Sequence, residues 1–187
     1  IRPVLTTSLG ICKAYNDMAR KAEGDILLLT QCDLEVNSKS QLSRMYDIWS
    51  PGRIVTERFI KGRNKDGIIR DNGYYLQFAM VARYEYLKAG GFYEGYDTPD
   101  SAAHEDGDLM ATFLENGLNL YHTTTPEDEG VYHIEHPRPN YENPDPILKA
   151  RLKKGREIYD SRHKENTFTL YAKQLSRHLM DRGRVLR

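Results

Sequence analysis

A short apolar run that leads into an acid constrains the fold of this chain most. Ile26 to Leu29 is preceded by Gly24-Asp25 and followed by the polar segment Thr30 to Asp33. A run of this length between polar residues is typical of a strand that is buried on both faces of a sheet. No apolar run approaches the roughly 20 residues that a membrane-spanning helix needs. The sequence therefore predicts a strand with other elements packed on both of its sides.

Helical and extended patterns alternate along the rest of the chain. Helices are expected over residues 11–22, 42–49, 85–89, 109–116, 146–159 and 168–179, and strands over residues 26–30, 54–59, 74–81 and 118–122. Asp145-Pro146 is a cap followed by proline at the first helical position, which is a helix start. The alternation predicts an α/β sandwich around a mostly parallel sheet. In such sheets, ligands bind at the carboxyl ends of the strands.

Charge is distributed unevenly over a chain whose formal net charge is zero. Residues 146–187 hold 12 of the 27 Lys and Arg and 4 of the 27 Asp and Glu, a net charge of +8 that residues 1–145 balance. We therefore expect a body over residues 1–140 and a basic helical extension over residues 141–187. The basic extension could bind a nucleic acid, an anionic membrane or an acidic partner. Alternatively, its helix docks on the acidic body of the same chain.

The two cysteines, Cys12 and Cys32, form neither a disulfide framework nor a zinc pattern. Such sparse use of cysteine favours a reducing compartment, and we expect a cytoplasmic protein. The sequence begins at Ile1 with residues that already read as the interior of a fold, and no signal peptide is visible. We expect a fragment or a processed chain.

Three groups of residues could carry chemistry, and the first ends the apolar strand. Asp33 follows the strand closely, so its carboxylate is expected at the carboxyl edge of the sheet. A hard divalent cation that bridges a diphosphate needs an oxygen ligand of this kind. An acid in this position can also be a simple turn or cap residue.

The second group is the acidic start of a helix, His104-Glu105-Asp106-Gly107-Asp108. Three carboxylates within four residues repel one another, and the positive end of the helix dipole partly offsets that repulsion. One of them could act as a general base toward a hydroxyl group. An ordinary acidic first turn would have the same composition.

The third group is His133-Ile134-Glu135-His136. In an extended chain the two histidines face opposite sides, so only one of them is expected in a given metal site. An imidazole can complete the coordination of manganese or a similar ion beside carboxylate and phosphate oxygens. A surface histidine pair without a ligand is the alternative.

These three groups occur in the same order in glycosyltransferases of the GT-A fold. The chain resembles family two of these enzymes, and also the galactosyltransferase-type C-terminal module of β-1,4-galactosyltransferases and chondroitin synthases. In that family an Asp-any-Asp motif follows the strand and binds the metal and the donor. Gln31-Cys32-Asp33 stands at this place, so the resemblance implies metal binding by Asp33 and donor contact by Gln31 and Asp33. Gln31 departs from the family's first acid.

The resemblance also implies roles for the later groups. Gly90-Gly91-Phe92 and the acidic helix start resemble the family's acceptor region, in which Asp106 would be the catalytic base and Glu105 an acceptor contact. His136 resembles the family's metal-binding histidine most closely, and His133 is the second choice. Ala14-Tyr15-Asn16 resembles the family's Ala-Arg-Asn. The further acceptor-binding candidates are Gly91, Tyr93, Tyr96 and Asp108.

The implied activity is transfer of a sugar from a nucleotide sugar, expected to be a UDP-sugar, to an acceptor hydroxyl. Inversion by single displacement with Mn²⁺ or Mg²⁺ is the expected mechanism, and the acceptor could be a glycan, protein, lipid or modified nucleobase. The resemblance covers residues 5–140 and lacks the family's first β-α-β unit, which holds the nucleotide. Two alternatives stay open: a non-catalytic binding or scaffold protein with a degenerate transferase fold, and a metal-dependent nucleotidyltransferase.

Overall fold

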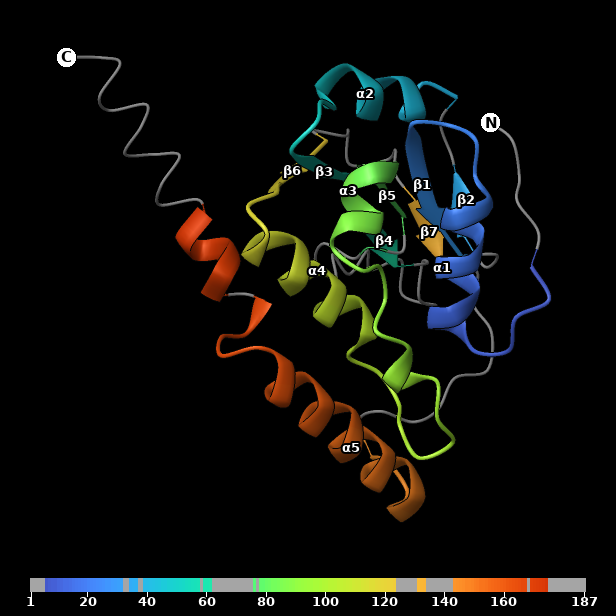
Figure 1. Ribbon diagram of the computed structural model, residues 1–187, viewed down its shortest axis with the longest axis vertical. Coiled ribbons are helices and arrows are strands. Elements are labelled where there is room, and N and C mark those ends of the chain that lie inside the picture. Colours follow the sequence, from blue (N-terminus) through green and yellow to red (C-terminus); the bar gives the residue numbers. More distant parts are fainter. Residues whose placement is uncertain are drawn as a thin grey trace, which may run out of the picture.

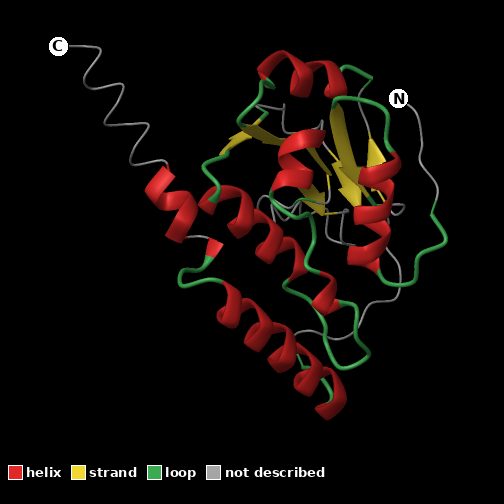
Figure 2. Ribbon diagram, viewed as in Figure 1, coloured by secondary structure: helices red, strands yellow, loops and turns green. Residues whose placement is uncertain are grey.

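The computed structural model describes residues 6–31, 34–36, 39–57, 59–61, 76, 78–123, 131–133, 143–167 and 169–174. The helices in these residues are α1 (Ile11–Lys21), α2 (Gln41–Ile48), α3 (Arg83–Lys88), the 3₁₀ helix η1 (Glu94–Tyr96), α4 (Glu105–Glu115) and α5 (Pro146–Arg162). The strands are β1 (Ile26–Thr30), β2 (Leu34–Val36), β3 (Arg53–Thr56), β4 (Phe59–Lys61), β5 (Phe78–Ala82), β6 (Asn119–His122) and β7 (Val131–His133). The helices are arranged around the strands (Figures 1 and 2).

The larger sheet contains four strands in the order β1-β5-β3-β6. β5 is antiparallel to both β1 and β3, and β6 is parallel to β3. Three of the four strands therefore run in one direction, as a mostly parallel sheet predicts, but β5 lies between two of them. As a result, only one of the three pairings is parallel. Sequence patterns indicate that a strand exists and do not indicate which neighbour it pairs with, so this insertion could not be predicted.

Both faces of this sheet are buried, as the apolar run Ile26 to Leu29 predicts. Leu27 and Leu29 belong to one hydrophobic cluster with residues of α1, α3 and α4. Ile26 and Leu28 pack on the opposite face against a second cluster, which includes Met45 of α2. Burying a leucine or isoleucine side chain fully stabilises a fold by about 1.5–3 kcal/mol. Successive side chains of β1 therefore pack on opposite faces of the sheet, against helices on each face.

A smaller sheet contains three strands in the order β2-β7-β4. β2 follows β1 after residues 31–33, and β4 follows β3 after residues 57–58. β7 is antiparallel to β2 and parallel to β4. Since β1 and β3 run in the same direction, the smaller sheet begins where the carboxyl ends of the larger sheet finish. The segment 31–33 thus joins the two sheets.

α5 lies alongside α4, below the larger sheet in Figure 1. The Asp145 carboxylate accepts a hydrogen bond from the Leu148 amide at 2.7 Å, and Pro146 is the first helical residue, as the sequence predicts. The helix continues to Arg162, three residues beyond the predicted end. The predicted terminal helix is present over residues 169–174 within the part that the structure describes. The predicted boundary between body and extension, at residue 140, lies outside the described residues.

Candidate active site

Three strands bring polar residues to one edge of the larger sheet. β1, β3 and β6 end at Thr30, Thr56 and His122, and the pairing places Thr56 opposite His122. Gln31 follows Thr30 directly and is partly buried. The Tyr15 hydroxyl of α1 donates to the Thr30 carbonyl oxygen at 2.7 Å, which ties α1 to this end of β1. Gln31 therefore lies at the carboxyl edge of the sheet, and its donor contact, which the resemblance implies, stays a prediction.

His122 forms a partly buried polar network at the same edge. Its Nδ1 lies 2.6 Å from the Thr56 hydroxyl oxygen, and its Nε2 lies 3.1 Å from the Tyr171 hydroxyl oxygen. Burial lowers the pKa of His122 to about 4, because the charged imidazolium would lose its hydration. The ring is therefore neutral at pH 7 and joins residues 169–174 to the sheet. Sequence analysis missed this role, since the two partners stand 66 and 49 residues away.

An unusual backbone turn precedes α4. Ala103 and His104 have φ angles of 60° and 74°, in the left-handed region that residues with a side chain rarely adopt. Glu105 and Asp106 follow as the first two residues of the helix. Each such residue costs of the order of 1–3 kcal/mol and persists only where surrounding contacts impose the conformation. Residues of this kind gather at functional sites, so the turn draws attention to the acids that follow it.

The environment of these acids is partly buried and negative. Burial raises the pKa of Glu105, and the charge of Asp97 raises it further. Burial also raises the pKa of the Cys12 thiol, with added repulsion from Asp97, Glu105 and Asp106. The charges at the start of α4 thus act on Cys12 at the start of α1. The structure therefore brings Glu105 and Asp106 together with a third carboxylate, Asp97, that sequence analysis did not single out.

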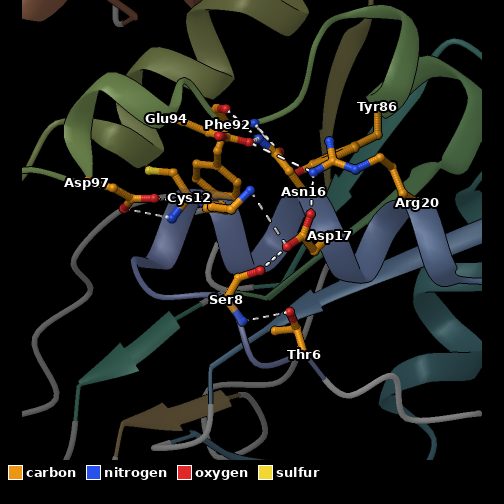
Figure 3. A network of polar contacts seen from close by, with 11 residues as sticks. Thr6, Ser8, Cys12, Asn16, Asp17, Arg20, Tyr86, Phe92, Glu94 and Asp97 are labelled. Atoms are coloured by element: carbon orange, nitrogen blue, oxygen red, sulfur yellow. Dashed lines mark hydrogen bonds and ion pairs between the residues drawn. The ribbon is translucent and has the colours of Figure 1, made fainter.

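Asp97 caps α1 from a distant part of the chain (Figure 3). Its two carboxylate oxygens accept hydrogen bonds from the amides of Cys12 at 3.0 Å and Lys13 at 2.7 Å. Gly10, the residue before the helix, has no side chain to serve as a cap, and a Cβ there would lie 2.4 Å from the Asp97 carboxyl carbon. Asp97 therefore replaces the usual local cap and fixes the loop between η1 and α4 against α1.

Asn16 binds Phe92, the residue that follows Gly91 (Figure 3). Its Oδ1 accepts from the Phe92 amide at 2.9 Å and from the Tyr86 hydroxyl at 2.8 Å, while its Nδ2 donates to the Phe92 carbonyl at 2.8 Å. Gly91 has φ of 67°, and a Cβ there would lie 2.2 Å from the Asn16 oxygen. This packing explains Gly91 and the Asn16 of the Ala14-Tyr15-Asn16 segment. The predicted acceptor contact of Gly91 stays a prediction.

Asp108 is fully buried and linked to α5 and its end. Its Oδ2 accepts a hydrogen bond from Arg162 Nε at 2.7 Å and from the Tyr96 hydroxyl at 3.2 Å, and it lies 3.3 Å from His163 Nε2. His163 Nδ1 lies 3.0 Å from Glu115 Oε2. These contacts account for Asp108 as an internal ion-pair residue. Its predicted contact with an acceptor stays untested.

Of the two predicted acceptor tyrosines, Tyr93 is exposed and Tyr96 is buried. The Arg162 guanidinium lies over the Tyr93 ring, 3.9 Å from its centroid, and the Tyr96 ring meets Tyr93 edge-on at 6.1 Å. The structure therefore gathers Tyr93, Tyr96 and Asp108 around one arginine of α5. One face of the Tyr93 ring is covered by that arginine.

The predicted metal ligands fall mostly outside the described residues. Asp33 and His136 lie there, and His133 is described through its backbone in β7. The register pairs His133 with Leu34, the residue that follows Asp33. Two strands about a hundred residues apart in the chain, β2 and β7, thus pair in the smaller sheet. Within the described part of the chain, no group of three or more His, Cys, Asp or Glu side chains could hold a metal ion.

The fold and the site together define an α/β protein whose polar residues gather beyond the carboxyl ends of its sheet. No protein-family model matches the chain, and no curated protein matches it. Among solved structures, a mannosyltransferase from Pyrobaculum calidifontis in complex with GDP-Man and Mn²⁺ matches 73% of this chain at 19% identity and a TM-score of 0.45. The match spans 39% of that mannosyltransferase chain. Among the described residues, no helix is long and apolar enough to cross a membrane.

Proposed function

We propose that this chain is the catalytic portion of a metal-dependent glycosyltransferase that moves a sugar from a nucleotide sugar to an acceptor hydroxyl. One observation carries the proposal: the left-handed turn at Ala103 and His104 delivers Glu105 and Asp106 at the start of α4. Backbone conformations of this cost gather at functional sites, which is a reason to attribute function to the acids that follow the turn.

Asp106 is the proposed catalytic base, and Glu105 the proposed acceptor contact. A carboxylate in this position removes the proton of the acceptor hydroxyl as the oxygen attacks the sugar, and the bond to the departing diphosphate breaks. Glu105 lies in a partly buried environment that raises the pKa of its carboxyl, and its oxygens can hydrogen-bond a sugar hydroxyl. Attack from the side opposite the leaving group inverts the anomeric carbon.

The proposed metal ligands are Asp33 and one histidine, His136 or His133, with Gln31 and Asp33 toward the donor. Two placements support this set: Gln31 lies at the carboxyl edge, and His133 pairs with Leu34 next to Asp33 in the sequence. A carboxylate with an imidazole suits Mn²⁺, and Mg²⁺ is the other candidate. When bound, such an ion stabilises negative charge on the leaving diphosphate.

The donor is proposed to be a UDP-sugar. The proposed acceptor is a hydroxyl group of a glycan, protein, lipid or modified nucleobase. Tyr93 is an acceptor candidate that is exposed to solvent, and the Arg162 guanidinium lies over one face of its ring. Helix α5, which belongs to the basic extension, packs on α4 of the same chain through the ion pair of Arg162 with Asp108.

The test is release of nucleoside diphosphate from a panel of UDP- and GDP-sugars with Mn²⁺, with mixed acceptors. It compares the parent chain, and any longer chain that contains it, with Asp106→Asn and Asp33→Ala. Asp100→Asn, at an exposed acid in the loop that precedes α4, is the control for the first substitution. Asp25→Ala, an exposed acid at the other end of β1, is the control for the second.

We expect release in the parent and in both controls, and a loss of at least about a hundredfold in the two test variants. Release of pyrophosphate in place of nucleoside diphosphate would indicate a nucleotidyltransferase. No release from any donor, together with a melting temperature that Mn²⁺ leaves unchanged, would favour a non-catalytic binding protein.

A further inference from the structure

We infer that α5 is a positioning element for the acidic turn of α4, and that Gly155 is the residue through which it acts. This inference rests on the proposed function of Glu105 and Asp106. It assigns the basic helical extension a role inside the site, in addition to its place on the surface.

The argument begins with a glycine in the middle of a helix. Gly155 lies in the third turn of α5 and is buried. Glycine in a helix interior costs about 1 kcal/mol relative to alanine, so a compensating contact is expected at this position. A Cβ on Gly155 would lie 2.4 Å from the Ala102 carbonyl oxygen and 3.0 Å from the Ala103 carbonyl oxygen. The helix backbone therefore rests directly on the backbone of the left-handed turn.

Hydrogen bonds on the preceding turn of α5 hold the same loop. The Ala102 amide donates to the Arg151 carbonyl oxygen at 3.2 Å, and the Arg151 guanidinium donates to the Ser101 carbonyl oxygen at 3.1 Å. Arg151 and Gly155 are four residues apart, so they share one face of the helix. That face binds residues 101–103 and leaves them little freedom to relax.

A second set of contacts fixes the other side of the acidic turn. The Thr167 hydroxyl donates to the Gly107 carbonyl oxygen at 2.9 Å and lies 3.0 Å from the Tyr159 hydroxyl oxygen. Arg162 binds Asp108 one residue further along α4. Contacts from α5 and the residues after it thus flank Glu105 and Asp106 on both sides in the sequence.

Together these contacts supply what two adjacent left-handed residues require, a surrounding structure that imposes their conformation. Without them, Ala103 and His104 would relax toward ordinary backbone angles, and the first turn of α4 would shift. A displacement of about 1 Å at a reacting group can lower a rate by about a hundredfold. Gly155 and Arg151 are therefore positioning residues for Asp106.

The test uses Gly155→Ala, with Lys154→Ala as control. Lys154 is exposed on the same helix, so its replacement leaves the loop contacts in place. Gly155→Ala improves helix propensity and forces the carbonyl of Ala102 to move, which separates helix stability from the position of the loop. Arg151→Met is the second variant, which removes the bond to Ser101 and adds no clash.

Two measurements are made on each variant. Hydrogen exchange followed by mass spectrometry reports on residues 102–109, where the Asp108 amide bonds to the His104 carbonyl oxygen at 2.8 Å. Steady-state kinetics of nucleoside-diphosphate release reports kcat, the donor KM and the pH profile of kcat. If Gly155 and Arg151 only stabilised the fold, their replacement would lower the fraction of folded, active protein. The acid limb of the pH profile, which reports ionisation of the catalytic base, would then stay unchanged.

We expect Gly155→Ala to exchange faster in residues 102–109 but not in α1 or β1. We also expect kcat to fall about 10- to 100-fold, an unchanged donor KM, and a shifted acid limb. Arg151→Met should move in the same direction by less. Unchanged exchange and an unchanged acid limb in both variants would overturn the inference. Faster exchange with no release in the parent would overturn the proposed function and leave the control of this turn by α5 standing.

Discussion

Arg162 of α5 and Asp108 of α4 form an ion pair with 2.7 Å between Nε and Oδ2, and the side chain of Asp108 is only 1% exposed. A charge buried to this extent depends on its partner, because it has lost its hydration. The pair therefore joins the basic helix to the body of the protein.

Arg162→Met should lower the free energy of unfolding by about 3 kcal/mol, because it leaves the Asp108 carboxylate buried without its main partner. Urea unfolding followed by the fluorescence of Trp49 measures the change. Arg156→Met is the control, since its pair with Asp160 on the same helix is exposed and should contribute about 0.5 kcal/mol or less. Equal losses in the two variants would mean that burial of Asp108 does not matter.

Gly91→Ala should destabilise the protein more than Gly90→Ala. Both glycines have positive φ angles, of 67° and 91°, so both variants have the backbone cost of a left-handed alanine, about 1 kcal/mol. A Cβ on Gly91 would also lie 2.2 Å from Asn16 Oδ1, whereas a Cβ on Gly90 meets nothing within 4 Å. We expect a further loss of about 1–3 kcal/mol at Gly91 from overpacking, measured by urea unfolding. The same stability in both variants would contradict the close packing of Asn16.

Asp97→Ala should lower the free energy of unfolding by about 1–2 kcal/mol, since two amides at the start of α1 lose their acceptor. Hydrogen exchange should speed up in the first turn of α1 and stay unchanged in α2. Asp100→Ala, at an exposed position three residues later, should change neither quantity. If Asp97→Ala left the exchange of the Cys12 and Lys13 amides as it was, the capping role would be refuted.

His122 should make stability fall in mild acid. Its pKa is about 4 in the folded protein and about 6.5 when unfolded, so the unfolded chain binds the proton more readily. The contribution of neutral His122 is fully present above pH 6.5 and is lost as the pH falls toward 4. We expect the decrease in unfolding free energy between pH 7 and pH 5 to be smaller in His122→Gln than in the parent.

A direct measurement is the NMR titration of the His122 ring, which should remain neutral to near pH 4. A midpoint near 6.5 would show that the ring is solvated and that its bonds to Thr56 and Tyr171 do not exclude water. The midpoint of His104, whose pKa burial also lowers, can be measured in the same spectra and compared with that of His122.

Several elements of the fold follow from local sequence patterns. Ile26 to Leu29 predicts a strand buried on both faces, and the structure confirms it through the two hydrophobic clusters that meet at β1. Asp145-Pro146 predicts a capped helix start, which the bond to the Leu148 amide confirms. These features depend on residues within a few positions of one another, so their energetics are already present in the sequence.

Fewer of the contacts in the candidate site could be predicted from local sequence patterns. Glu105 and Asp106 could be identified because acids at a helix start form a compact pattern. Asp97 could not, because it caps α1 by accepting from the Cys12 amide, 85 residues before it. The contacts of His122 with Thr56 and Tyr171 also join residues that are far apart in the sequence. Each depends on which strands are neighbours, and the antiparallel insertion of β5 shows that strand order was not predictable.

The sequence by itself thus determined the α/β class, the buried strand, the main helices and the acidic turn, since periodicity and capping act between near neighbours in the chain. Only the tertiary structure decided that Asp97 closes the start of α1, that Asp108 is buried against Arg162, and that Gly155 lies against the left-handed turn. The physical reason is that burial and desolvation give a polar side chain or a glycine its role, and both depend on what packs against it from elsewhere in the chain.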